Sequence, residues 1–323
     1  MTFAKEPTGS LYAISDMHLD FKKNMEALHQ LPIFPGSRLI TGGDLCTKPE
    51  HLRTALSILT QRFDRVYWVP GNHELWSSKK PESEESARGV DKYLWLVDIC
   101  REFNVLTPED PFDTWHGVGG PCTIAPLFIP YDYSFMDDPN ADWAAWSEQE
   151  RVEKAVAWAV EDGILCSDEK LINTTPYRDI AEWCRARVGY SHDRLRAIPP
   201  DRPIILVNHF PLRGDLVRLR PQMRRFRIWC GTNLTEQWHR EFNIACAISG
   251  HLHIRATDYR DGVRFEEVSL GYPRDWEATQ GIGAYLRVIL PAPAEPEQTN
   301  HHTVFHRRGN HRAERLRRAK EVT

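Results

Sequence analysis

The chain lacks the cysteine pattern of a disulfide-stabilised or zinc-ribbon protein. Its seven cysteines are an odd number and include no CxxC pair. This scatter predicts reduced thiols, as in a cytosolic protein, in preference to a disulfide framework. The sequence also has no apolar run near the ~18 residues that a membrane span needs, and its first residues do not follow the basic-then-apolar layout of a signal peptide. We therefore expect a soluble, unexported, cytoplasmic protein without a membrane partner.

An excess of basic charge is also missing, since the formal net charge is -4. Residues 295–323 nevertheless contain seven Lys or Arg and four Glu, so they carry +3 while residues 1–294 carry -7. A body this acidic argues against a nucleic-acid partner. We predict one folded domain over 1–294 and a mobile, basic C-terminal tail over 295–323 that begins with a linker rich in Pro and Glu. The alternative for this tail is an arm that binds an anionic partner.

Apolar runs of strand length alternate with helical patterns in the first part of the chain. Strands are expected at 10–15, 37–43 and 65–70, and helices at 24–31 and 51–63. The later strand-like runs, most of them spaced too closely for intervening helices, cover residues 123–130, 202–209, 244–250, 263–270 and 284–290. These patterns predict a mixed α/β fold with a layered sheet core and helices outside.

Residues 134–200 have a different, helical pattern. Ser147 and Glu150 stand in capping-box register, an apolar face follows, and Gly163 suits a helix end. A second helix, or a pair, is expected over 179–198. Because this segment lies between two strand-rich parts, we interpret it as a helical insertion that forms a lid over a site. An outer cover packed on the sheet is the equal alternative.

Polar residues that can bind metal ions follow five of the apolar runs. In open α/β sheets, ligands bind beyond the carboxyl ends of the strands, so these segments should deliver their side chains to one place. Residues two apart in an extended chain point the same way, so a DxH or HxH pair can supply two ligands. The segments are AISDMHLD with Asp16 and His18, LITGGDLC with Asp44, WVPGNHE with Asn72 and His73, ILVNHFP with Asn208 and His209, and AISGHLHI with His251 and His253.

These groups combine carboxylate, imidazole and amide side chains and contain no sulfur. The combination suits a divalent ion such as Mn, Fe, Ni or Zn better than calcium, which prefers oxygen ligands. A single histidine at a strand end is more often a hydrogen-bonded structural residue. Several such residues at five strand ends are hard to explain in that way, so the sequence predicts a metal site.

The ordered blocks DxH, GD, GNHE, NH and GHxH resemble the calcineurin-like metallophosphoesterase superfamily. The resemblance implies a two-layered mixed β-sandwich flanked by helices and a dinuclear, metal-dependent phosphoric ester hydrolase. It further implies two divalent metal ions, one held by Asp16, His18 and His253, the other by Asn72, His209 and His251, with Asp44 bridging them.

Catalytic roles follow from the same resemblance. The two ions would activate the attacking water and neutralise charge on the phosphoryl oxygens. His73, which is not a metal ligand in the family, would contact those oxygens or protonate the leaving group. Glu74 is expected to orient a ligand from behind. The minor alternative, a non-catalytic scaffold on the same fold, is disfavoured because every ligand position is filled.

The range of possible substrates is narrowed by positions at which this sequence differs from better-defined members of the superfamily. The stretch GGDLCTKP lacks the arginine of the GDxVDRG pattern in protein Ser/Thr phosphatases and the tyrosine of purple acid phosphatases. We expect hydrolysis of a small phosphorylated metabolite, with monoesters preferred, and a phosphodiesterase acting on cyclic or dinucleotide substrates as the alternative. The expected substrate contacts are Arg213, Tyr131 and Arg274, with Trp76, Tyr133 and Tyr272 as further candidates, although packing or a salt bridge could explain each of them. The oligomeric state is not indicated.

Overall fold

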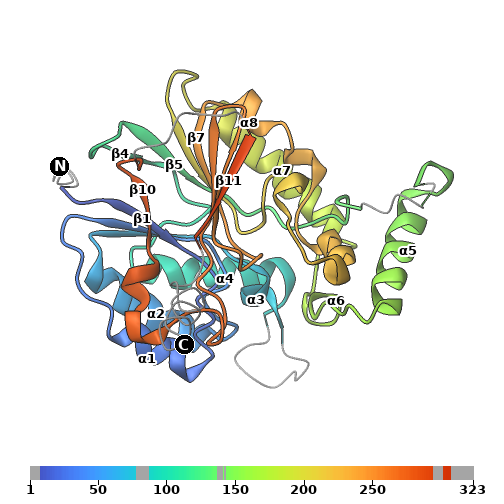
Figure 1. The fold of residues 1–323 in the computed structure, drawn as a ribbon, viewed down its shortest axis with the longest axis horizontal. Helices are drawn as coiled ribbons and strands as arrows, with labels where there is room; N and C mark the ends of the chain where they lie inside the picture. Colours follow the sequence, from blue (N-terminus) through green and yellow to red (C-terminus); the bar gives the residue numbers. More distant parts are fainter. Residues whose placement is uncertain (1–7, 78–86, 137–140, 142, 294–300, 307–323) are drawn as a thin grey trace, which may run out of the picture.

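The computed structural model describes residues 8–77, 87–136, 141, 143–293 and 301–306. They form two stacked β-sheets with helices outside, which confirms the expected two-layered mixed β-sandwich (Figure 1). The strands are β1 (Leu11–Ile14), β2 (Arg38–Thr41), β3 (Arg65–Trp68), β4 (Asp113–Trp115), β5 (Cys122–Pro126), β6 (Ile204–Val207), β7 (Ile244–Ser249), β8 (Ala256–Arg260), β9 (Val263–Glu267), β10 (Arg287–Leu290) and β11 (His301–Phe305).

The helices include short and long segments. The α-helices are α1 (Lys22–His29), α2 (Pro49–Arg62), α3 (Asn72–Leu75), α4 (Gly89–Glu102), α5 (Glu148–Glu161), α6 (Asp168–Leu171), α7 (Ile180–Arg196) and α8 (Trp238–Glu241). The 3-10 segments are η1 (Trp143–Ala145), η2 (Gly214–Leu216), η3 (Pro221–Trp229), η4 (Asn233–Thr235), η5 (Ala278–Gln280) and η6 (Ile282–Tyr285). None of the helices in the described ranges is both long and apolar enough to cross a membrane.

Parallel strands form the centre of both sheets. The smaller sheet has the order β10-β1-β2-β3, in which β1, β2 and β3 are parallel and β10 runs antiparallel to β1. The larger sheet has the order β11-β8-β9-β7-β6-β5-β4, in which β5, β6, β7 and β9 are parallel. The two sets of parallel strands therefore present their carboxyl ends as two edges beyond which side chains can meet.

The apolar core has two layers, because side chains alternate between the two faces along each strand. Ile40 of β2 and Tyr67 of β3 belong to the cluster between the sheets, together with Ile205 of β6. Their neighbours Leu39 and Trp68 point to the opposite face and pack in the cluster that the helices cover. Because consecutive side chains face opposite ways, each strand fills two apolar layers. This explains why the central strands have near-continuous apolar sequences.

The segment expected to be a helical insertion divides into three parts. Ser147 and Glu150 form the predicted capping box at the start of α5, which contacts η3 and lies apart from the sheets in Figure 1. Cys184 of α7 packs on the outer layer of the larger sheet, so α7 is a cover. Within the described part of this segment, only the residues around α6 extend to the predicted site, as described below.

The expected tail begins outside the described residues, but part of it is described. Residues His301–Phe305 form β11, an antiparallel partner of β8 at the edge of the larger sheet. Its Thr303 hydroxyl donates to Asp258 at 2.6 Å. The strand was not expected, because its sequence was interpreted as linker and tail. The prediction of mobility for residues 307–323 concerns a part that the structure does not describe.

Candidate metal centre

The five predicted segments bring their candidate ligands together beyond the carboxyl ends of the strands. Asp16 and His18 follow β1, Asp44 follows β2, and Asn72 opens α3 directly after β3. From the larger sheet, His209 follows β6, and His251 and His253 follow β7. Seven candidate ligand side chains from the two sheets therefore lie beyond the carboxyl ends of five parallel strands.

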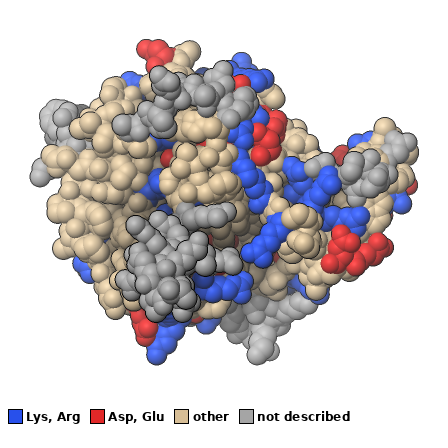
Figure 2. Space-filling view, viewed as in Figure 1, with Lys and Arg blue, Asp and Glu red and all other residues tan. Residues whose placement is uncertain are grey.

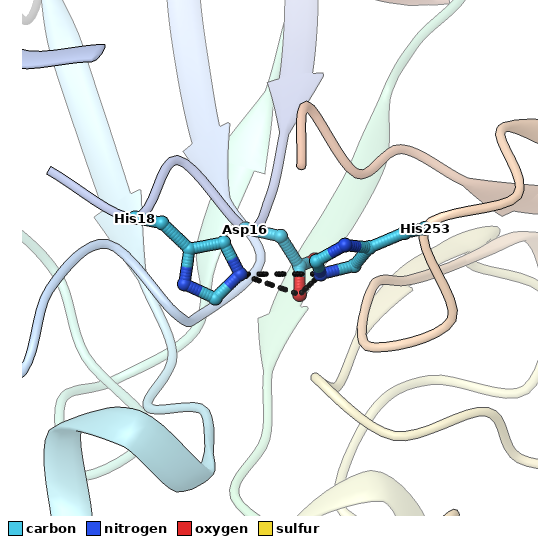
Figure 3. Close-up of side chains that lie close together, drawn as sticks. All are labelled: Asp16, His18 and His253. Carbon is cyan, nitrogen blue, oxygen red and sulfur yellow. Dashed lines mark hydrogen bonds and ion pairs between the residues drawn. The ribbon is translucent and has the colours of Figure 1, made fainter. Parts of the chain in front are cut away.

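The first cluster consists of Asp16, His18 and His253 (Figure 3). His18 Nε2 lies 3.2 Å from His253 Nε2, and Asp16 Oδ1 lies 3.1 Å from His253 Nε2. Asp16 Oδ1 is 4.0 Å from His18 Nε2. Two ligands at ~2.1 Å from one ion, at angles of ~90–110°, lie ~3.0–3.4 Å apart. The two shorter spacings fall in this range and fit a shared divalent ion, whereas the spacing between Asp16 and His18 is wider.

The second cluster consists of Asp44, His209 and His251, with Asn72 beside them. His209 Nε2 lies 3.4 Å from Asp44 Oδ2 and 3.2 Å from Asn72 Oδ1. His251 Nε2 is buried and has no hydrogen-bond partner among the described residues. A buried, unpartnered imidazole nitrogen is costly unless it coordinates a ligand, so the donor set fits a second ion.

Asp44 occupies the centre of the site. Besides the second cluster, it belongs to a third group of potential ligand atoms with His18 and His73. His18 is in turn a member of the first cluster. This position between the two clusters agrees with the bridging role that the family resemblance implies for Asp44.

Outer hydrogen bonds orient the candidate ligands. The ring of His209 contacts the Gly42 carbonyl oxygen through Nδ1 at 2.8 Å, which directs Nε2 into the site. His253 Nδ1 lies 3.5 Å from Asp275 Oδ2. The Ser269 hydroxyl donates to Asp16 Oδ2 at 2.7 Å. Such partners set the imidazole tautomer and hold the carboxylate in place.

Glu74 supports the site through backbone amides. Its carboxylate accepts N–H bonds from Gly71 and Asp44, both at 2.9 Å, and from Leu45 at 2.6 Å. This joins the GNHELW turn to the GD turn. The two turns pack closely, because a Cβ added to Gly71 would lie 2.1 Å from Asp44 Oδ1. We expected Glu74 to orient a ligand side chain. Its carboxylate instead binds the backbone amides of two turns that carry candidate ligands.

Five of the seven candidate ligands have left-handed backbone conformations. Asp16, His18, Asp44, His251 and His253 have φ values of 53°, 42°, 53°, 71° and 52°. Such angles are uncommon for residues other than glycine and cluster at functional sites. The surrounding fold therefore forces the chain to turn where these side chains must point inward.

Charges in the site favour cation binding. Burial raises the pKa values of Asp16 and Asp44, but neighbouring imidazoles overcome this and hold both pKa values well below their ordinary range. Burial lowers the pKa values of His209 and His253, but the Asp44 and Asp16 carboxylates overcome this and raise each pKa to about 10. Burial, together with the charge of His209, lowers the pKa of His251 to about 3. The carboxylates are thus anionic, and two imidazoles retain protons that a metal ion must displace.

We expect metal binding to release protons and to tighten as the pH rises. The raised pKa values of His209 and His253 mean that both rings are protonated at neutral pH without a cation. Apparent Mn²⁺ affinity of the metal-free protein should therefore increase between about pH 6 and pH 9. Calorimetric titration in two buffers of different ionisation enthalpy measures this. A binding enthalpy that is the same in both buffers would contradict the prediction.

A cavity of about 710 Å³ opens at the metal centre. It is lined by His18, Asp44, Asn72, His73, His251 and His253 and by the predicted contacts Arg274, Trp76 and Tyr272. The Tyr272 ring stacks on His18 with centroids 4.3 Å apart, and Trp76 stacks on His73 at 3.8 Å. The lining is completed by residues 165–168 of the insertion segment and by Arg218, Leu219, Arg220, Met223, Phe226, Leu252, Ile254 and Asp275.

Two predicted substrate contacts are located elsewhere. Arg213 does not line this cavity; its guanidinium donates to Asp215 Oδ1 at 2.8 Å and approaches the ring of His239. Tyr131 is 1% exposed and packs against Phe210 in the core. The loop after β6 directs the Arg213 side chain, which is 12% exposed, toward Asp215 and His239. The apolar ring of Tyr131 gains more from burial. Arg213 closely follows the motif that contains His209, but this position in the sequence did not indicate contact with the site.

Other cavity residues were not predicted. Asp168 of α6 is 2% exposed and faces Asn72 and Trp76, and Asp275 contacts His253. Arg218 and Arg220 lie at the cavity before η3. Asp168 follows no apolar strand-like run, so the pattern that identified the ligands could not identify it. Asp275 is adjacent in sequence to the predicted contact Arg274 but was not itself predicted.

Comparisons with known proteins agree with this geometry. A model of the calcineurin-like phosphoesterase family matches residues 9–255. The acyl-carrier-protein phosphodiesterase PptH of Mycobacterium tuberculosis (strain ATCC 25618 / H37Rv) is 41% identical over 295 residues, which cover 90% of this chain and 86% of that protein. The crystal structure of the phosphopantetheinyl hydrolase PptH from Mycobacterium tuberculosis matches with a TM-score of 0.80 and 38% identity, over 92% of this chain and 100% of the other.

Proposed function

This chain belongs to the calcineurin-like phosphoesterases, as a metal-dependent phosphoric ester hydrolase, and we propose that it cleaves the phosphodiester joining a phosphopantetheine arm to a carrier protein. The observation that carries the proposal is the 41% identity, across nine tenths of this chain, to an acyl-carrier-protein phosphodiesterase. The main expectation from the sequence, a monoesterase acting on a small metabolite, is less well supported than its phosphodiesterase alternative. Within that alternative, a carrier-bound diester replaces the cyclic or dinucleotide substrate.

A clamp on a terminal phosphate by Arg213, one of the expected substrate contacts, would favour monoesters. Arg213 instead pairs with Asp215 away from the cavity. A diester has one negative charge fewer than a terminal phosphate and does not need such a clamp.

The chain's residues can divide the chemistry as follows. Asp16, His18 and His253 would hold one ion, Asn72, His209 and His251 the other, and Asp44 both. When bound, a pair of divalent ions supplies an activated water and neutralises charge on the phosphoryl oxygens. The water oxygen forms a bond to phosphorus while one ester P–O bond breaks, and the departing oxygen takes up a proton. His73, which lines the cavity beside Asp44, would give that proton.

The cavity has walls suited to a long, uncharged arm. Part of its lining is apolar and comes from Leu165, Leu219, Met223, Phe226, Leu252 and Ile254. Phe226 stacks near His251, with centroids 5.9 Å apart, so this wall adjoins the second ligand cluster. An extended arm could lie along the wall while its phosphate reaches the metal centre.

The cavity also has basic residues suited to an acidic partner. Arg218, Arg220 and Arg274 line it, and Arg220 and Arg274 are exposed. Lys and Arg side chains gather on the face shown in Figure 2, toward the side on which α5 projects. A basic rim steers and orients an acidic protein surface, which a small metabolite would not require.

The proposed function is tested with a carrier protein that bears its phosphopantetheine arm. We expect the Mn²⁺-loaded enzyme to release the arm, detected as a mass decrease of the carrier, and to cleave bis(p-nitrophenyl) phosphate faster than p-nitrophenyl phosphate. An unchanged carrier, together with faster cleavage of the monoester, would overturn the proposal and restore the small-metabolite monoesterase.

Charge reversal at the rim should separate protein recognition from chemistry. Arg220→Glu with Arg274→Glu should lower kcat/KM for the carrier about tenfold or more at low salt. Hydrolysis of bis(p-nitrophenyl) phosphate, which does not extend to a protein surface, should change much less. The matched control is Arg196→Glu with Arg202→Glu, two arginines that line a separate hollow before β6, at the amino ends of the strands. Equal losses on both substrates would exclude the rim as a docking surface.

A further inference from the structure

Asp168 connects the helical insertion to the metal centre. It is the first residue of α6 and is 2% exposed. Its Oδ1 accepts two hydrogen bonds from the GNHELW turn, one from Asn72 Nδ2 at 3.0 Å and one from Trp76 Nε1 at 2.7 Å. One carboxylate oxygen thus contacts both a candidate metal ligand and an aromatic residue of the cavity wall.

The first bond decides which end of the Asn72 amide faces the site. Only the amide oxygen can coordinate a cation, whereas the NH₂ group would repel it. Asp168 Oδ1 accepts this bond, and only the NH₂ group of the amide can donate it, so the NH₂ group points toward α6. The amide oxygen then lies 3.2 Å from His209 Nε2, where both atoms can share an ion.

The second bond holds the indole that supports His73. Trp76 stacks on the His73 ring with centroids 3.8 Å apart and an interplanar angle of 28°. With its N–H fixed by Asp168, the indole is a rigid surface for the imidazole, whose side chain is 14% exposed. His73 can therefore keep one orientation toward Asp44 and the cavity.

Backbone contacts dock α6 independently of the Asp168 side chain. Trp76 forms an isolated antiparallel bridge with Ile172, and the Ser77 N–H donates to the Leu171 carbonyl at 2.8 Å. Loss of the carboxylate should therefore leave this segment in place. The effect of an Asp168 variant can be assigned to the side chain.

We propose that Asp168 is a positioning residue through which the helical insertion orients the Asn72 amide for metal binding and holds the Trp76–His73 pair. This role goes beyond the proposed function, because it applies to any phosphoester that the centre hydrolyses. It also gives the insertion a task other than covering the cavity.

Metal affinity provides the test. In Asp168→Ala the Asn72 amide is free to turn, so binding of one of the two Mn²⁺ ions should weaken about 10–100-fold while the other is retained. Chelator competition monitored by metal content measures this without reference to turnover. The matched control is Glu169→Gln on the same helix, whose carboxylate accepts bonds from Tyr133 and Trp229 and touches no candidate ligand. It should leave both affinities unchanged.

A reciprocal exchange separates positioning from general packing. Asn72→Asp alone places two carboxylates side by side and should weaken Mn²⁺ binding. Adding Asp168→Asn restores a donor–acceptor pair with the roles reversed, so the double variant should bind Mn²⁺ more tightly than Asn72→Asp alone. Unchanged Mn²⁺ affinity in Asp168→Ala, or a double variant no better than the single one, overturns the proposal. If Asp168→Ala does not fold, as judged by circular dichroism, the exchange alone decides.

Discussion

Asp44→Asn is expected to reduce phosphodiester hydrolysis by at least about 10³-fold while leaving the fold intact. Asp44 lies between the two ligand clusters, and neighbouring imidazoles hold its pKa well below the ordinary range despite burial. The substitution keeps the shape of the side chain but removes the negative charge that two cations would share. We expect at least one ion to be lost, because their mutual repulsion is then uncompensated.

Turnover of bis(p-nitrophenyl) phosphate and elemental analysis of the same preparation measure both effects. Asp193→Asn, on an exposed position of α7, is the matched control and should behave as the unmodified protein. A variant that kept both ions and more than about a tenth of its activity would show that Asp44 is not the bridge.

His73→Ala should lower turnover about 10²–10⁴-fold while both metal ions are retained. Its Nε2 lies 3.8 Å from Asp44 Oδ2, and its ring is held on the Trp76 indole at the cavity. We place it as a proton donor, because Asn72 already occupies the ligand position of this turn. The loss should be smallest for bis(p-nitrophenyl) phosphate, whose nitrophenolate leaves without a proton, and largest for an alkyl ester such as the carrier-bound arm.

Metal content distinguishes this role from coordination. The atoms of His73, His18 and Asp44 are close enough together to hold an ion. If His73→Ala lost one ion, or reduced nitrophenyl and alkyl esters equally, His73 would have to be assigned to the metal shell.

The metal centre could be predicted from sequence because its residues follow strands. Apolar runs such as RVYWVP identify strands, and parallel strands end at a common edge, so Asn72 and His209 could be placed together although 137 positions separate them. Local chemistry was equally informative at Ser147, whose capping box marks the start of α5. Strand ends and helix caps are determined by residues close together in the sequence, so a local sequence pattern can predict them.

The rest of the site depends on tertiary packing that no local pattern records. Asp168 is polar and follows no strand, so only the docking of α6 against the GNHELW turn brings it to Asn72. Arg213 illustrates the opposite error, since it follows a ligand motif closely but turns toward Asp215. The edge strand β11 was missed because its five residues lie in a segment that was interpreted as linker and tail, and it is pairing with β8 that places them in the larger sheet.

The left-handed backbone of five candidate ligands implies a trade-off between stability and activity. Each such residue costs on the order of 1 kcal/mol relative to a relaxed conformation, and the rest of the fold must compensate. Glycine adopts these angles without that cost. A metal-free protein with glycine at His251, whose buried Nε2 has no hydrogen-bond partner among the described residues, would therefore unfold at a higher temperature than the metal-free parent, although it could no longer assemble the centre. Selection for thermal stability alone would thus erode this position, and only selection for the reaction maintains it.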